Sequence, residues 1–338
     1  MVSNINLRNM MRVISLFMFM IIMCVAYVPA SGETDNTVVI HDETKLLDEH
    51  PALEAFSLRR MTSNYSGPIV TMKRSWDGAE KNISLAGELI NVSAVLDFAT
   101  DEGAQPDANA HVVKWFDQSG NGGHLHVDLQ SRALLYPSSG PFIVMNGSMV
   151  TDTRGYPGLR WNGSGSQALG RYDDEGMKAN NTGLSVFWVT DILDEHSIDH
   201  IWSLSGVDES EYRHIQMCFR DGNYQWFRIG NSSEFTTKSS GHYPVYGRYL
   251  HNTHFYPGEI KIRSNGLDIT SIGHNFSHHN VGDRIVGGNP NGWGSIDGII
   301  SEILFFPSLH ESKITEIKHS MADCYNLSVT ARNPEALL

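Results

Sequence analysis

The stretch Gly294-Ser-Ile-Asp-Gly-Ile-Ile-Ser-Glu-Ile-Leu-Phe-Phe306 decides the fold class of this chain. Apolar and small residues fill most of its positions, which predicts a strand buried on both faces or nearly so. Pro307 follows and ends the strand. Ser308 then precedes Glu311 by three residues, which is the spacing of a helix capping box. The chain therefore closes with a central strand followed by a helix.

This helix is predicted over residues 308–325, because four apolar side chains recur on one helical stripe. They are Ile314, Ile317, Met321 and Cys324. The stripe predicts that the helix lies against the sheet that contains the central strand. Residues 329–338 are predicted to be a frayed tail.

The chain upstream of the central strand has a β pattern. With 41% hydrophobic and 19% charged residues in 338, it can bury a sizeable core, which excludes a disordered chain. Turn signals separate the apolar runs, and Asn265-Gly266 between two alternating runs predicts a hairpin. The predicted strands are 69–73, 111–116, 142–145, 184–191, 201–204, 213–219, 225–229, 248–256, 259–263 and 267–272. No composition shift divides this region, so we expect one domain over residues 51–328.

The beginning of the chain is predicted to be a targeting segment followed by a linker. Arg8 and Arg12 precede an apolar run from Val13 to Val28, which predicts a secretory signal peptide over residues 1–30. Residues 31–50 are acidic and polar and are predicted to be a linker. Pro51 suits the first turn of a helix, so a short helix is expected over residues 51–60.

The net charge limits the partners of the chain, and its sequons agree with secretion. The net charge of -13 argues against a nucleic-acid partner, and no second apolar segment predicts a membrane span. We expect a secreted, extracellular glycoprotein; unused sequons in an Asn-rich chain are the alternative. The nine Asn-x-Ser/Thr sequons begin at Asn64, Asn82, Asn91, Asn146, Asn162, Asn180, Asn231, Asn275 and Asn326.

Two resemblances connect these patterns to known folds. The strand and helix at the end of the chain resemble the close of a concanavalin-like or laminin-G-like jelly roll. Residues 55–67, Met72-Lys-Arg-Ser-Trp-Asp77 and Trp115-Phe-Asp-Gln-Ser-Gly-Asn-Gly-Gly-His124 follow one another as in the catalytic domain of arabinofuranosidase B, a family 54 glycoside hydrolase. The resemblance implies an all-β, two-sheet antiparallel jelly-roll sandwich with a short N-terminal helix and a C-terminal helix. That family carries a further arabinose-binding domain, for which we expect no room here.

The family resemblance also implies where catalytic groups would lie. Asp221 falls at the nucleophile position, where the family has a longer Glu. The acid/base carboxylate follows a Gly-Gly pair, and here Gly287-Gly288 is followed by Asn289. An amide cannot donate the proton that a leaving sugar oxygen needs, so the resemblance implies that double displacement is disabled. Asp283, Asp297, Glu302 and Glu209 are alternative carboxylates, each of which a solvated or turn-capping role explains as well.

Aromatic and polar side chains supply the candidate sugar contacts. Trp226 lies beside the Asp221-Gly222 turn and Trp293 follows a loop, so each is a candidate to stack on a sugar ring, with core packing as the alternative. Asn223 and Asp117 are candidate hydrogen-bonding partners. Residues 117–123 also have the composition of a compact glycine turn, which is the structural interpretation of Asp117.

The sequence gives only weak signals for a metal site or a cofactor site. The histidines show no zinc-ligand spacing, and no cofactor motif is present, so no cofactor is expected. Calcium in a loop is an alternative for residues 173–175 and 191–195, with solvated loops as the default. Cys218 and Cys324 are the cysteines that remain after removal of the signal peptide. Two alternatives stay open: the two residues form a disulfide bond, or both are thiols.

Three functions remain in competition. The first is a secreted domain that binds carbohydrate, with arabinose-containing glycans as the expected partner and weak or no hydrolysis. The second is an active retaining α-L-arabinofuranosidase, which requires two carboxylates about 5–5.5 Å apart. The third is a structural or adhesive surface protein, which a large exposed apolar patch would favour.

Overall fold

The computed structural model describes most of the chain between residues 45 and 329. The described residues are 45–127, 139–163, 167–171, 183–193, 198–206, 214–220, 224–230, 235–242, 247–256, 258–273, 281–288 and 296–329.

Three helices and twenty strands make up this part. The helices are α2 (Leu46–Glu49), α3 (Val92–Thr100) and α4 (Glu311–Cys324). The strands are β1 (Glu54–Ser57), β2 (Pro68–Arg74), β3 (Glu80–Ala86), β4 (Leu89–Ile90), β5 (Ala110–Trp115), β6 (Leu125–His126), β7 (Phe142–Met145), β8 (Ser148–Met149), β9 (Leu159–Asn162), β10 (Leu169–Arg171), β11 (Leu184–Ile192), β12 (Ile198–Gly206), β13 (His214–Arg220), β14 (Tyr224–Gly230), β15 (Phe235–His242), β16 (Gly247–Tyr256), β17 (Glu259–Ser264), β18 (Leu267–Gly273), β19 (Val281–Val286) and β20 (Asp297–Pro307).

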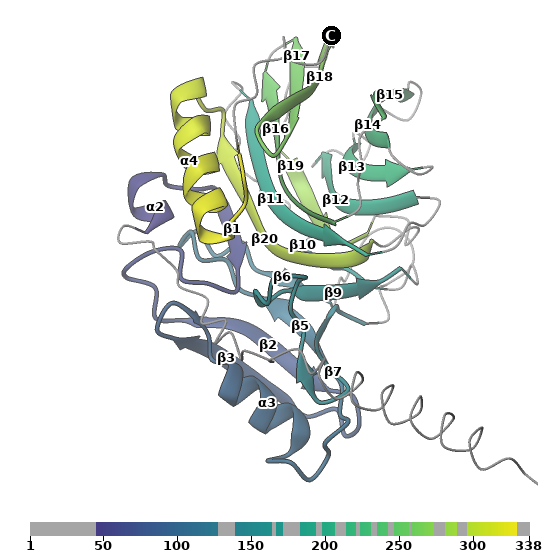
Figure 1. Ribbon diagram of the computed structural model, residues 1–338. Helices are drawn as coiled ribbons and strands as arrows, with labels where there is room; N and C mark the ends of the chain where they lie inside the picture. The colour runs from purple at the N-terminus through teal and green to yellow at the C-terminus, as the bar shows by residue number, and fades with distance from the viewer. Residues whose placement is uncertain are drawn as a thin grey trace, which may run out of the picture. The chain divides into compact units, whose positions relative to one another are not determined.

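Thirteen of the twenty strands form two antiparallel layers, as the jelly-roll prediction requires, and β9, β7 and β5 connect β20 of one layer to β6 of the other. One layer has the order β1-β20-β11-β16-β17-β18. The other has the order β6-β10-β19-β12-β13-β14-β15. Figure 1 shows β16, β11 and β20 as long curved strands side by side, with α4 on one side of them and β12 to β15 on the other. The all-β sandwich is therefore confirmed.

Aromatic side chains fill the space between the two layers. Trp202 of β12 lies 5.7 Å from Trp188 of β11, 6.3 Å from Phe255 of β16 and 6.4 Å from Phe305 of β20, measured between ring centroids. All four are buried. These edge-to-face pairs hold the layers together.

The end of the chain follows its prediction closely. β20 is buried from Asp297 to Phe306, so both of its faces are covered. In α4, all four stripe residues of the sequence pattern are buried: Ile314, Ile317, Met321 and Cys324. Asn265 and Gly266 have φ of 46° and 80° between β17 and β18, which are the left-handed conformations of the predicted hairpin turn.

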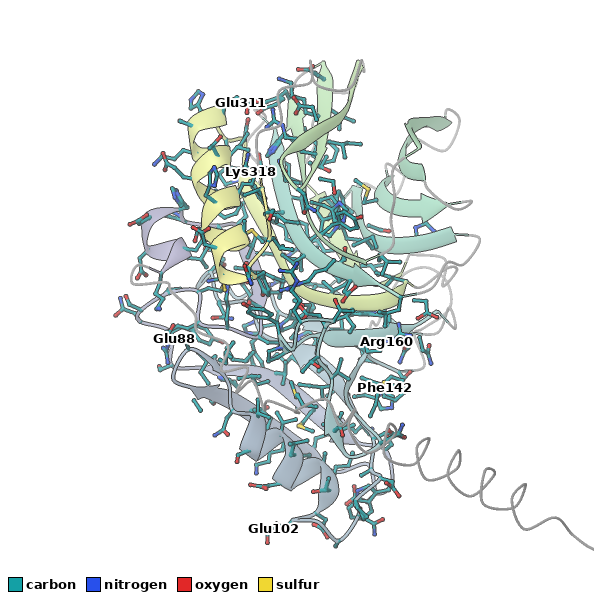
Figure 2. The ribbon with its side chains drawn as sticks, in the orientation of Figure 1. Glu88, Glu102, Phe142, Arg160, Glu311 and Lys318 are labelled. Atoms are coloured by element: carbon teal, nitrogen blue, oxygen red, sulfur yellow. The ribbon has the colours of Figure 1, made fainter. Side chains whose placement is uncertain are left out.

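The predicted capping box of α4 is wrong. The helix begins at Glu311, and its N-cap is His310, without a side-chain cap. Ser308 is still bound to the sheet through a backbone hydrogen bond to the Gly183 carbonyl. The Glu311 carboxylate instead accepts two hydrogen bonds from Arg263, at 2.9 and 3.0 Å. Figure 2 shows Glu311 near the start of α4 and Lys318 further along it.

The predicted helix over residues 51–60 is also wrong. Its centre is strand β1, in which all four residues are buried and pair with Glu302–Phe305 of β20. Pairing with a central strand outweighs a weak local helical pattern, because strand preference depends on packing context. A short helix does exist just upstream, α2, inside the segment predicted to be a linker.

Candidate functional site

One end of the sandwich gathers strand ends that are far apart in the sequence. Strand β12 lies between β13 and β19: Trp202 pairs with Met217 on one side and with Val286 on the other. β13 ends at Arg220, which pairs with Ile198 at the start of β12. β10 begins at Leu169, which also pairs with Val286. We call this the loop end, because connections 163–167, 193–198, 220–224, 242–247 and 288–296 start and finish there.

Both proposed catalytic positions follow strands that finish at the loop end. Asp221 comes directly after β13, and Asn289 comes soon after β19. β12 separates these strands, so they lie about 10 Å apart, two strand spacings. β13 also extends three residues further than β19, because Val286 at the end of β19 is level with Met217 of β13. Asp221, Asn223, Asn289 and Trp293 themselves, and the Trp226 side chain, lie outside the described residues, so their roles stay predictions.

The Gly-Gly pair before Asn289 has a defined structural reason. Gly287 has φ of 81°, and its N–H donates to the Ile201 carbonyl at 2.7 Å. A Cβ added at Gly287 would lie 1.9 Å from Trp161 Nε1, so only glycine fits against this buried ring. The Gly288 carbonyl accepts a hydrogen bond from Ser203 Oγ at 3.2 Å. These contacts fix the direction in which the chain leaves β19.

The described alternative carboxylates have structural partners. Asp297, at the loop end, pairs with Arg160, which Figure 2 labels. Glu302 is fully buried, and it accepts hydrogen bonds from Ser57 Oγ, both Arg59 Nε and Nη2, and Tyr325 Oη, at 2.8 to 3.1 Å. A carboxylate so bound joins β1, β20 and the end of α4. The Asp283 side chain and Glu209 lie outside what the structure describes.

Asp117 organises the glycine turn of residues 117–123. Its carboxylate accepts hydrogen bonds from the backbone N–H groups of Ala55, Ser119 and Gly123, at 2.9 to 3.0 Å, and from Ser119 Oγ at 2.8 Å. Asp117 is buried. This is the structural interpretation of the motif, and it accounts for both carboxylate oxygens. A contact of Asp117 with sugar stays a prediction.

Glu54 is a buried carboxyl group that the sequence reasoning missed. It pairs with Arg284 inside the sandwich, and burial raises its pKa to about 7, more than Arg284 lowers it. A Cβ at Gly123 would lie 2.3 Å from Glu54 Oε1, so the glycine turn closes over this group. A Glu beside the apolar run of β1, with an Arg in β19, is the signal that could have indicated the pair.

A serine–histidine pair links β11 and β16 but has no access to substrate. His254 Nδ1 is 2.9 Å from Ser185 Oγ, and the other ring nitrogen contacts the Asn252 amide. All three residues are fully buried. Burial lowers the pKa of His254 to about 3, so its ring is neutral at pH 7. The pair is part of the packing between β11 and β16.

The cysteine alternatives stay open. Cys324 is buried beside Arg59 and Tyr156. Cys218 belongs to β13, and its side chain is outside the described ones. Figure 1 draws β13 and α4 on opposite sides of β11 and β20, an arrangement that does not favour a bond between them.

The described sequons lie where glycans could be attached. Asn64, Asn82, Asn146, Asn162 and Asn326 are exposed. Asn91 is half-buried, and its Oδ1 caps α3 by accepting from the Ala94 N–H at 3.0 Å. Asn180, Asn231 and Asn275 lie outside the described residues.

Metal and membrane features can be assessed for the described residues alone. Among them, His, Cys, Asp and Glu side chains form no group of three that could hold a metal ion. Asp191 accepts a hydrogen bond from the Thr153 N–H at 2.8 Å, and the other calcium candidates lie outside this part of the chain. Of the helices described, none has the length and hydrophobicity of a membrane span.

Comparison with known proteins places the fold. No protein family model matches the chain, and no curated protein sequence is similar to it. Solved structures do match. A variant α-L-arabinofuranosidase of glycoside hydrolase family 54, soaked with 4-nitrophenyl α-L-arabinofuranoside, matches with a TM-score of 0.64 at 14% identity. A structure of an α-L-arabinofuranosidase of that family soaked with a cyclic sulfate inhibitor matches with a TM-score of 0.60 at 13% identity. An arabinofuranosidase complexed with arabinofuranosyl-α-1,2-xylobiose matches with a TM-score of 0.59 at 15% identity.

Each of these matches covers 82% of this chain and 64% of the other. The chain thus spans less than two thirds of the length of the arabinofuranosidases that it matches. Identities of 13 to 15% establish the fold alone. The fold that the sequence resemblance implied is confirmed: this chain has the β-sandwich fold of family 54 arabinofuranosidases.

Proposed function

We propose that this chain is a secreted domain that binds arabinose-containing glycan at the loop end and hydrolyses it weakly or not at all. The observation that carries the proposal is the convergence of β13 and β19 on either side of β12. The candidate nucleophile position follows one strand, and the candidate acid/base position follows the other. Residues that follow two strands separated by a single strand can contact the same glycan.

The loss of hydrolysis follows from the side chain at position 289. A retaining glycosidase needs one carboxyl group that donates a proton and a second that attacks the sugar. An amide at the first position still hydrogen-bonds to hydroxyl groups but donates no proton to the leaving oxygen. Loss of general acid catalysis costs about 10²–10⁴-fold in rate, whereas ground-state contacts remain. Binding is therefore expected to persist where turnover is lost.

The experiment is to incubate the purified chain with arabinan and with an aryl arabinofuranoside, and to measure binding of arabino-oligosaccharides by calorimetry. The aryl leaving group needs little acid assistance, so it reports on the nucleophile separately. We expect binding without steady release of arabinose. Steady release that Asp221→Ala abolishes would contradict the proposal.

Secretion is part of the same proposal. The exposed sequon asparagines support it, because an oligosaccharide can be attached only to an accessible side chain. Expression of the full chain in eukaryotic cells tests it. We expect the protein in the medium, with a mass that falls after enzymatic removal of N-glycans. Retention inside the cells without glycans would contradict secretion.

A further inference from the structure

A surface cleft lies beside the turn between β2 and β3, in another part of the molecule from the loop end. It is lined by Ser75, Trp76 and residues 105–109, and its volume is about 310 Å³. This is at the lower end of the 300–1,000 Å³ that is typical of small-molecule sites. Figure 2 shows Glu102, which precedes the 105–109 loop, well away from Arg160 near the loop end.

Trp76 is held in one orientation although its side chain is 44% exposed. The Arg74 guanidinium lies 4.3 Å from the centroid of its ring and 4.7 Å from the centroid of Phe98, so it is stacked between the two aromatic rings. Trp76 Nε1 donates to the Ala99 carbonyl at 3.3 Å. One face of the indole is therefore covered by a cation and its N–H is bound, which leaves the opposite face for solvent or a ligand.

Arg74 is itself fixed by its ion pairs. It forms a two-point contact with Asp77 and a hydrogen bond to Asp101 at 3.1 Å. These contacts order the aromatic platform before any ligand binds, which lowers the entropy cost of binding. Asp77 and Asp101 also offset the positive charge of Arg74, and exposed Glu102 and Asp107 lie nearby. The surroundings are acidic on balance, which disfavours an anionic ligand.

The rest of the cleft offers hydrogen-bonding groups. The Ser75 N–H donates to the Asn109 carbonyl at 3.0 Å and ties the turn to the loop. Asn109 Oδ1 accepts from the Asn146 N–H at 2.8 Å, so the Asn109 amide group can serve as a donor. The side chains of Gln105 and Asp107 line the same cleft and are exposed. An exposed aromatic face beside polar groups fits a ring with an apolar C–H face and a hydroxyl rim.

We propose that Trp76 and residues 105–109 form a second saccharide-binding site, separate from the loop end, which takes a neutral sugar ring. The ring stacks on the open face of Trp76, and Gln105, Asp107 and Asn109 bind its hydroxyl groups. Such a site would hold a polymeric glycan while another part of the same polymer reaches the loop end. Binding of a long glycan at one site would raise its effective concentration at the other site, so the two sites together would bind it more tightly than either alone.

Glycan-free protein from a bacterial host tests the second site by NMR titration. The probes are arabinohexaose and xylohexaose as neutral ligands and hexagalacturonate as an anionic one. We expect a neutral probe to shift the Trp76 indole signal, and Trp76→Ala to weaken that site at least about tenfold. Trp76→Phe keeps an aromatic face and should retain most of the affinity. Asp107→Ala, at an exposed position, should weaken binding without a change in folding.

The outcome distinguishes this site from the loop end. Trp293→Ala should leave the Trp76 signal shift intact, whether or not the loop end binds glycan. Neutral-probe affinity that Trp76→Ala does not change would overturn the second site, as would binding of the anionic probe alone. A third result would also overturn it. In that case no probe binds the glycan-free protein, and in protein from eukaryotic cells a glycan attached to neighbouring Asn146 covers Trp76.

Discussion

The body of the sandwich and its loop end are built on different principles. In the body, a buried charge such as Glu302 is surrounded by donors from Ser57 of β1, from Arg59 just after β1, and from Tyr325 just after α4. At the loop end, the described structure supplies strand ends and one tightly constrained junction, Gly287 against Trp161. We therefore expect the body to determine stability, and substitutions in the loops beyond the strand ends to affect it less. Substitutions in the two regions should separate stability from glycan binding.

The largest effect is expected in the body, from Glu302→Ala. The change leaves the Arg59 guanidinium buried without its carboxylate partner, and breaking a buried ion pair in this way costs about 3–5 kcal/mol. Urea unfolding measures the loss, with Glu80→Ala as a control. Glu80 pairs with Lys73 and both side chains are about half exposed, so its removal should cost about 1 kcal/mol or less. Similar losses for the two variants would show that the buried network does not stabilise the body.

A second effect in the body depends on pH. The unfolded chain ionises Glu54 near its ordinary pKa of 4.5, whereas the folded protein does so only near 7. The contribution of Glu54 to stability is therefore fully present below pH 4.5 and is lost as the pH rises through 7, up to about 3 kcal/mol. Urea unfolding of the wild type and Glu54→Gln between pH 4 and 8 should give diverging curves. Exposed Glu80→Gln serves as the control, and parallel curves for Glu54→Gln would refute the pKa shift.

The sequence predicted the elements of the body more fully than the residues of the loop end. The apolar run of 294–306 and the stripe of Ile314, Ile317 and Met321 are local patterns. Such patterns can be recognised in the sequence without knowing which segments pack against them. The helix expected at 51–60 failed because pairing between β1 and β20 joins residues far apart in the chain, which no local pattern records. The capping box failed for the same reason, since Arg263 competes for Glu311.

The candidate site shows the same division. A resemblance indicated Asp221 and Asn289 as candidate positions, and only glycine fits at Gly287, two residues before Asn289. The partners of Asp117 and Glu54 could not be predicted, because they come from strands distant in sequence. The exposure of Trp76 likewise depends on the stacking of Arg74 between two rings, which only three-dimensional packing reveals.

Gly287→Ala tests both regions at once, because it should lower stability and also impair glycan binding. The new Cβ would collide with Trp161 and force a positive φ on alanine, at a cost of about 2–3 kcal/mol. Gly155→Ala is the matched control: its φ is 87°, and its Cβ would meet nothing within 4 Å. It should lose only the backbone term, about 1–2 kcal/mol, and retain binding. Unfolding curves and calorimetry on both variants test this, and equal glycan affinity in the two would contradict a role of the junction in placing the site.

The smallest effect on stability is expected at the loop end itself. Asn289→Asp should change the free energy of unfolding by no more than about 0.5 kcal/mol, the usual range for a surface substitution. Asn291→Asp, two residues along, adds the same charge and is the matched control. Thermal unfolding of both variants gives the comparison. A large loss for Asn289→Asp alone would mean that position 289 belongs to the body.

The central claim is that binding outlasted catalysis when the acid/base position became an amide. The most direct measurement is the rate of arabinose release from arabinan by Asp221→Glu and by the double variant Asp221→Glu/Asn289→Asp. The account predicts that the added carboxyl group raises the rate by about 10²–10⁴-fold, while arabino-oligosaccharide affinity changes little. Equal rates in the two variants, or full activity in the wild type, would contradict it.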